Sequence, residues 1–136
     1  MSYWLLSSGK NVFRFSDCLK KYGFVYWSQN NKVNVDDLIL IYVSDPIRAV
    51  KYLMKVTEID RSFKETIDNE EFWIDKTKYE KGKEKDRYFR LDFVKEFNSD
   101  KGLRFYDLSH NGLGGVQNMQ RIEGEKYDYF HKVGVL

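Results

Sequence analysis

The chain has 136 residues, of which 42% are hydrophobic and 17% aromatic, and its formal net charge is +2. This length is enough to bury a core, so we expect one domain over residues 1–136. The near-neutral charge excludes a histone-like polycation, but nucleic acid stays a candidate partner if the 23 Lys and Arg residues gather on one face. The lone Cys18 excludes an internal disulfide and favours a reducing, cytoplasmic location. No apolar run is long enough to span a membrane.

The first third of the chain predicts two strands around a helix. Tyr3 to Ser7 is dense in aromatic and aliphatic residues, which is typical of a strand. Ser16 and Asp17 have the short oxygen-bearing side chains that cap helix N-termini, and Gly23 suits a left-handed C-terminal cap, so a helix should end near Tyr22. Phe24 to Ser28 then predicts a short strand.

The stretch from Leu38 to Val43 is apolar on both faces, which predicts a central strand that is covered on both sides. Pro46 ends it, because proline cannot donate to a strand ladder. Apolar and polar residues then alternate, so a second strand should have one drier face, formed by Val50, Tyr52, Met54 and Val56.

The region from Phe63 to Arg87 is rich in Lys, Glu and Asp. Within it, Glu71 to Ile74 is interpreted as a strand, and Lys76 to Arg87 as a solvated loop. The loop has two interpretations, a basic flap over nucleic acid or a soluble connector, and its mixed charges favour the connector.

The remainder predicts more strand and a closing helix. Alternation over Tyr88 to Phe97 places Phe89, Leu91, Phe93 and Phe97 on one face of a strand. After it come a strand-like Arg104 to Tyr106, a helical turn capped by Asp107, a glycine loop to Gln120, and a helix from Lys126 to Val133. The sequence therefore predicts an α+β fold: a small β-barrel of five or six strands, flanked by one early helix and short later helices.

Catalytic patterns are missing from the sequence. His110 and His131 occur without metal-ligand spacing, and no GxSxG nucleophile turn or [DE]-x-K nuclease triplet occurs. The glycines from Gly112 to Gly115 lack the Lys-Ser/Thr of a phosphate loop. We therefore expect a binding protein without catalytic residues, metal or cofactor, and keep an enzyme acting on nucleotides as the less favoured class.

The order of the motifs resembles that of the EVE domain, a member of the PUA-like superfamily that is related to YTH domains. The motifs are Tyr3 to Ser7, Tyr26-Trp27-Ser28, Val35 to Ser44, and the late Gln117 and Arg121-Ile122. The chain departs from the pattern at Asp36-Asp37, where the family prefers Gly-Asp, so the turn glycine is replaced.

This resemblance implies a PUA-like barrel that reads a modified, flipped-out base, with modified cytosine in DNA favoured. It also implies a defence context, alone or as an N-terminal module of a longer McrBC-type restriction protein, with an AAA+ GTPase or nuclease subunit as a partner. An RNA-binding or small-molecule-binding PUA-like module is the alternative.

The same resemblance implies a set of site residues. Trp27 would supply the ring on which a base stacks, although a core tryptophan is the competing interpretation, and Trp4 is expected in the core. The expected base pocket comprises Ser7, Tyr26, Trp27, Ser28, Tyr42, Ser44 and Gln117, and the expected phosphate contacts are Lys10, Arg14, Lys32 and Arg48.

Overall fold

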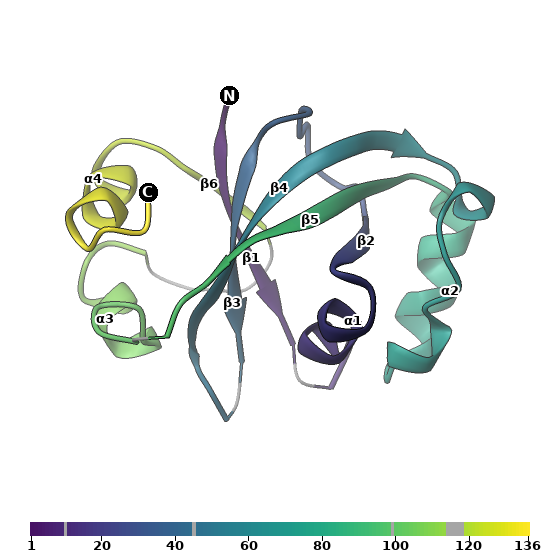
Figure 1. The fold of residues 1–136 in the computed structure, drawn as a ribbon, viewed down its shortest axis with the longest axis horizontal. Helices are drawn as coiled ribbons and strands as arrows, with labels where there is room; N and C mark the ends of the chain where they lie inside the picture. Colours follow the sequence, from purple (N-terminus) through teal and green to yellow (C-terminus); the bar gives the residue numbers. More distant parts are fainter. Residues whose placement is uncertain (10, 45, 99, 114–118) are drawn as a thin grey trace.

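The computed structural model describes residues 1–9, 11–44, 46–98, 100–113 and 119–136. Over these residues the chain forms a curled six-stranded sheet with helices on both faces, which confirms the predicted α+β class (Figure 1). The sheet order is β2-β5-β4-β3-β1-β6. The strands are β1 (Tyr3–Ser8), β2 (Phe24–Ser28), β3 (Leu38–Val43), β4 (Ala49–Arg61), β5 (Tyr88–Glu96) and β6 (Gln120–Ile122). The helices are α1 (Phe15–Tyr22), α2 (Lys76–Lys85), α3 (Phe105–Ser109) and α4 (Glu125–Lys132), with single 3-10 turns η1 (Phe63–Glu65) and η2 (Glu70–Phe72).

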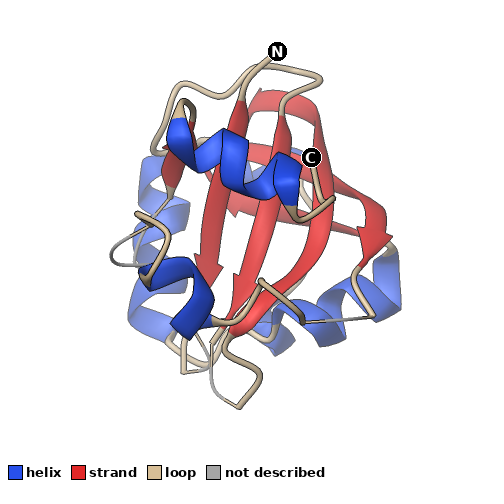
Figure 2. Cartoon of the chain, turned by 90° about the vertical axis from the view of Figure 1, so that its left-hand side faces the viewer, coloured by secondary structure: helices blue, strands red, loops and turns tan. Residues whose placement is uncertain are grey.

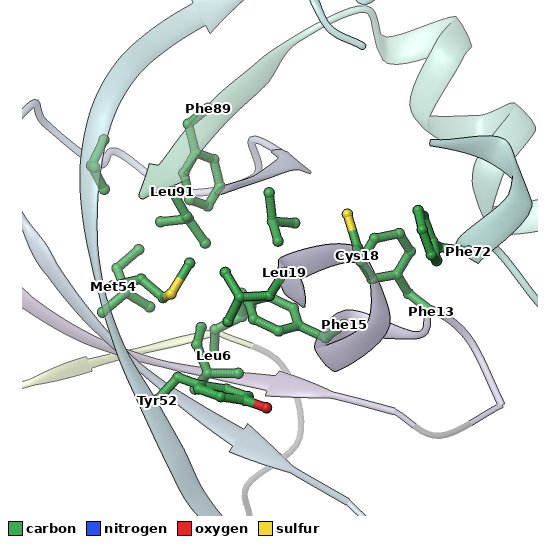
Figure 3. Packing of buried hydrophobic residues seen from close by; sticks show 14 of the residues in the cluster. Leu6, Phe13, Phe15, Cys18, Leu19, Tyr52, Met54, Phe72, Phe89 and Leu91 are labelled. Carbon is green, nitrogen blue, oxygen red and sulfur yellow. The ribbon is translucent and has the colours of Figure 1, made fainter. Parts of the chain in front are cut away.

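Strand β3 is the centre of this sheet, as its apolar run predicts. It pairs in parallel with β1 and antiparallel with β4. Ile39 and Ile41 belong to one buried cluster, beneath α1, whereas Leu40 and Tyr42 belong to a second cluster, which packs against α3 and α4. Figure 2 shows the C-terminal helix lying across the strands on this second face, and Figure 3 shows the first cluster. Both faces of β3 are apolar because helices cover both.

Helix α1 has the predicted C-terminus but not the predicted N-cap. Gly23 adopts the left-handed conformation (φ 80°) and its N–H donates to the Leu19 carbonyl at 2.7 Å. The helix begins at Phe15, and its cap residue Arg14 makes no side-chain capping bond. The assignment of Ser16 as a cap is therefore wrong, and its hydroxyl instead accepts a hydrogen bond from the Tyr52 hydroxyl at 2.8 Å.

The charged segment that was predicted as a loop is helix α2, so that prediction is wrong. Lysine and glutamate are good helix formers, and the Asp75 side chain caps the helix by accepting from the Lys78 N–H at 3.2 Å. Tyr79 is the one buried side chain of α2, which explains why the sequence shows no apolar periodicity there. The predicted strand from Glu71 to Ile74 is also wrong, because η2 occupies most of it and Trp73 forms only an isolated bridge with Phe13.

Strand pairing is irregular at one place between β3 and β4 and near Phe93 in β5. At both places the side chains face other directions than the alternating pattern predicts. In β4 the pairing shifts between Ile41 and Tyr42, so Val50 points into the second cluster, whereas Tyr52 and its alternating neighbours point into the first. In β5 a shift next to Phe93 likewise sends Phe97 to the second cluster. One extra residue reverses which face the later side chains occupy. Phe93 itself is 46% exposed.

The C-terminal part agrees with the prediction more closely at its end than at its start. The predicted strand at Arg104 to Tyr106 is wrong, because Arg104 forms a single bridge with Ala49 and α3 begins at the next residue. The last predicted helix is confirmed as α4, within one residue at each end.

Asp37 is a fully buried polar side chain at the entry to β3. Its carboxyl oxygens accept hydrogen bonds from the Ser2 N–H at 2.8 Å, the Trp4 indole N–H at 3.0 Å and the Asn34 N–H at 2.9 Å. These bonds tie the loop before β3 to the start of β1. Trp4 is 7% exposed, which confirms that it is a core residue.

The residue before Asp37 has a strained backbone conformation. Asp36 adopts φ 78°, a left-handed conformation that costs non-glycine residues energy. We expect Asp36→Gly to raise the free energy of unfolding by about 0.5–1 kcal/mol, since the exposed ion pair with Lys55 at 3.3 Å contributes little. Urea unfolding would measure the change, with Lys55→Gln as the control for the ion pair. A loss of stability in Asp36→Gly would show that the aspartate side chain, and not the backbone conformation, matters at this turn.

Candidate functional site

A cavity of about 800 Å³ opens between the ends of β1 and β2 and helix α2. One wall is aromatic. Trp27 of β2 and Trp73, which follows η2, stack with their ring centroids 6.1 Å apart and their planes at 30°. Phe13 lies at 84° to the Trp27 ring with the centroids 5.5 Å apart, and its centroid is 4.8 Å from that of Trp73, so Phe13 packs against both indoles. Trp73 is 9% exposed and Trp27 is half-buried.

The neighbouring wall carries small polar groups. Ser7 lies on β1, Ser28 ends β2, and Asn30 and Asn31 follow in the next loop. Hydroxyl and amide side chains both donate and accept hydrogen bonds. A flat ligand against the indoles would therefore find polar partners for its edge.

Helix α2 contributes Lys78, Lys81 and Lys85 to the lining of the cavity, and its Tyr79 ring lies 5.9 Å from Trp73. Lys85 donates a hydrogen bond to the Asn30 side-chain oxygen and so joins the helix to the polar wall. The helix lies close to β5 because residue 82 is glycine: a Cβ there would stand 3.0 Å from the Tyr88 hydroxyl oxygen. Burial raises the pKa of the Tyr88 phenol to about 12.

This buried phenol gives a pH-dependent prediction. Because the pKa of Tyr88 in the folded protein exceeds the ordinary value of about 10, the neutral phenol favours folding below pH 10, and this contribution is lost as the pH rises toward about 12. We expect the free energy of unfolding to fall between pH 10 and 12, and to fall less steeply in Tyr88→Phe. Urea unfolding of both proteins at several pH values would test this. Parallel pH profiles would mean that other groups cause the alkaline loss.

The structure brings together three of the expected base-pocket residues, Ser7, Trp27 and Ser28. Of the other expected residues, the described ones, Tyr26, Tyr42 and Ser44, do not line this cavity. The Tyr26 hydroxyl donates to a Glu58 carboxyl oxygen at 3.1 Å, and Tyr42 packs near Phe105 in the second cluster. Ser44 lies in the turn after β3, where its N–H donates to the Ser8 carbonyl, and Gln117 lies outside the described residues.

None of the described residues that were expected to contact phosphate lines the cavity. The Arg14 guanidinium donates to the Glu71 carbonyl and lies over the Phe72 ring. Lys32 is exposed in the loop after β2. Arg48 lies over the Phe105 ring, with 5.2 Å between the guanidinium carbon and the ring centroid. Lys10 lies outside the described residues.

The sequence reasoning missed Trp73, the two asparagines and the lysines of α2. The lysines had a detectable signal, because residues three and seven positions apart share one side of a helix. Trp73 had none, because it reaches the cavity through the contact of its segment with residues 12–14: the Arg14 N–H donates to the Phe72 carbonyl at 2.8 Å, and the Ile74 N–H to the Val12 carbonyl at 2.8 Å.

The lining of the cavity combines indole rings, small polar side chains and lysines. Within the described ranges, no group of three or more His, Cys, Asp or Glu residues could hold a metal ion. The Cys18 thiol is buried, and this burial raises its pKa to about 12. The described helices include none that is long and apolar enough to cross a membrane. The cavity can stack a flat ring, hydrogen-bond its edge and attract negative charge.

The fold is a curled six-stranded half-barrel with short helices, and solved structures of other proteins share it. A hypothetical protein from Leishmania major superposes with a TM-score of 0.67 at 21% identity, covering 98% of this chain and 94% of that one. An ASCH protein from Zymomonas mobilis matches with a TM-score of 0.66 at 11% identity, covering 97% and 95%. Human THYN1, solved in complex with 5-methylcytosine-containing DNA, matches with a TM-score of 0.62 at 15% identity, covering 98% and 97%. No protein-family model and no curated protein matches the sequence.

Proposed function

We propose that this protein is an EVE-like reader of nucleic acid, which holds a modified, flipped-out base in the cavity beside Trp27 and Trp73 and has no catalysis of its own. The observation that carries the proposal is the pair of stacked indoles at 6.1 Å that walls a cavity of about 800 Å³. A base has a flat π surface, and proteins hold flipped or unstacked bases by aromatic stacking together with hydrogen bonds to the polar edge.

The polar wall fits the second requirement. The hydroxyls of Ser7 and Ser28 and the amides of Asn30 and Asn31 supply donors and acceptors beside the indoles. Modified cytosine in DNA is the ligand that we favour, and the likeness of the fold to human THYN1, solved with 5-methylcytosine-containing DNA, supports it.

The proposal extends to a cytoplasmic defence role. A partner AAA+ GTPase or nuclease subunit would act on DNA that this domain has recognised. The support for this part is the resemblance of the motif order, from Tyr3 to Ser7 through to Arg121-Ile122, to EVE domains of restriction proteins.

A binding screen tests the base-reading function directly. Oligonucleotides of one sequence would carry cytosine, 5-methylcytosine or 5-hydroxymethylcytosine, as single-stranded DNA, duplex DNA and RNA, with affinity measured by fluorescence anisotropy. We expect at least one modified DNA to bind about tenfold or more tightly than its unmodified counterpart, which corresponds to about 1.4 kcal/mol. Equal affinity for all DNAs would contradict the proposal, and a preference confined to RNA would favour the RNA-binding alternative.

A further inference from the structure

The lysines of α2 divide into two groups with different surroundings. Lys78, Lys81 and Lys85 line the cavity, and at 100° per residue they fall within about 60° of one another around the helix. All three are exposed. Among the described residues, the Lys78 and Lys81 ammonium groups have no hydrogen-bond or ion-pair partner, and Lys85 bonds only the neutral Asn30 amide. We call these three residues the lysine row.

The other charged groups of α2 lie on different sides of the helix. Lys76 donates to the Glu70 carbonyl at 2.9 Å, and Lys83 pairs with Glu80 at 3.6 Å while it lies over the rings of Phe63 and Tyr79. Glu80 and Glu84 are about 60° or more away from the lysine row around the helix. The cavity therefore faces cations that no acidic residue of α2 neutralises.

From this arrangement we infer that α2 is the phosphate-binding edge of the site, and that the ligand is a nucleic acid strand and not a free nucleoside or mononucleotide. The inference rests on the proposed function. Lys78 and Lys85 are seven residues apart, so the row is about 10 Å long, which equals the axial rise of about three stacked nucleotides of one strand. A mononucleotide has one phosphate group and could engage only part of the row.

The geometry also orders the bound strand relative to the cavity. The indoles of Trp27 and Trp73 line the same cavity as the lysine row, and the Trp73 ring lies 5.9 Å from the Tyr79 ring of α2. A base that stacks on the indoles would thus leave its backbone beside α2, where ammonium groups bind phosphate oxygens as point charges. The hydrogen bond from Lys85 to Asn30 places the phosphate edge next to the polar wall.

Two triple variants with the same change in net charge test the inference. Lys78→Gln/Lys81→Gln/Lys85→Gln removes the row, and Lys20→Gln/Lys64→Gln/Lys132→Gln removes three exposed lysines that do not line the cavity. Glutamine keeps the helix propensity of lysine. Affinity for a modified oligonucleotide would be measured by anisotropy at several salt concentrations, and binding of the corresponding modified nucleoside by calorimetry.

We expect the row variant to bind the oligonucleotide at least tenfold more weakly at low salt, and the slope of log affinity against log salt to fall in magnitude by about 2 to 3, since each phosphate contact contributes about 0.7–0.9. Nucleoside binding should weaken much less than oligonucleotide binding, because a nucleoside has no phosphate group, and the control variant should resemble the wild type. Equal losses in both variants, or an unchanged slope in the row variant, would overturn the role of α2 while leaving base reading intact. Failure of the wild-type protein to bind any modified oligonucleotide would instead remove the proposed function, and this inference with it.

Discussion

We expect the Leu40→Asp variant to be unfolded at 25 °C, so that neither heat nor urea produces a cooperative unfolding transition. Leu40 is fully buried in the central strand, opposite Leu5 on β1 and Leu53 on β4. Losing a buried leucine costs about 2–5 kcal/mol, and an unpaired carboxylate in the same place costs several kcal/mol more. The sum is comparable to the whole stability of a small domain, which is about 5–15 kcal/mol.

Circular dichroism during thermal and urea unfolding would measure this effect. The matched control is Phe93→Asp, which places the same charge on β5, two strands away from β3 in the sheet, but at a position that is 46% exposed. We expect the control to remain folded. A cooperative melt of Leu40→Asp near the wild-type temperature would show that β3 is not the covered centre of the sheet.

The strands and helices that the sequence predicted well are those with a clear apolar pattern. The continuous run from Leu38 to Val43 indicated a strand with both faces covered, and Gly23 marked the end of α1. Such patterns indicate burial directly. Side chains that face a core are apolar, and they recur with the period of the strand or helix to which they belong.

The apolar pattern of the sequence did not predict helix α2 or the two register shifts, and the reasons are physical. A helix that buries only Tyr79 has no apolar stripe to detect, so its propensity and its Asp75 cap were the available signals. The faces of Val50 and Phe97 depend on irregularities in strand pairing, which involve a partner strand and leave no mark in the alternation itself.

The candidate site was predictable only on the strands. Trp27 and Ser28 stand together in the sequence. Ser7 on β1 lines the same cavity although β1 and β2 lie far apart in the strand order, so the curl of the sheet brings them together. Trp73 comes from a segment whose position is set by main-chain bonds to residues 12–14. The lysine row required α2 to be a helix. Half of the cavity therefore depends on tertiary contacts between segments far apart in the sequence.

The largest expected effect on binding comes from Trp27→Ala. Removing a ring on which a base stacks costs about 1–3 kcal/mol per base, so affinity for the preferred oligonucleotide should fall about tenfold or more. Trp27 also packs against Phe13, Phe15 and Trp73, so some stability will be lost too. Binding should therefore be measured by anisotropy at a temperature where circular dichroism shows that the variant is folded.

Trp4→Ala is the matched control, because it removes the same side chain from a buried position that does not line the cavity. It deletes the donor to Asp37 at 3.0 Å as well as core packing, so we expect a loss of about 3–5 kcal/mol in the free energy of unfolding. The fraction that stays folded should bind normally. If Trp4→Ala abolishes binding while folded and Trp27→Ala does not, the ring that contacts the base has been assigned wrongly. If neither change alters the affinity for any modified oligonucleotide, base stacking in this cavity is refuted, because the half-buried indole of Trp27 is the ring on which the proposed base stacks.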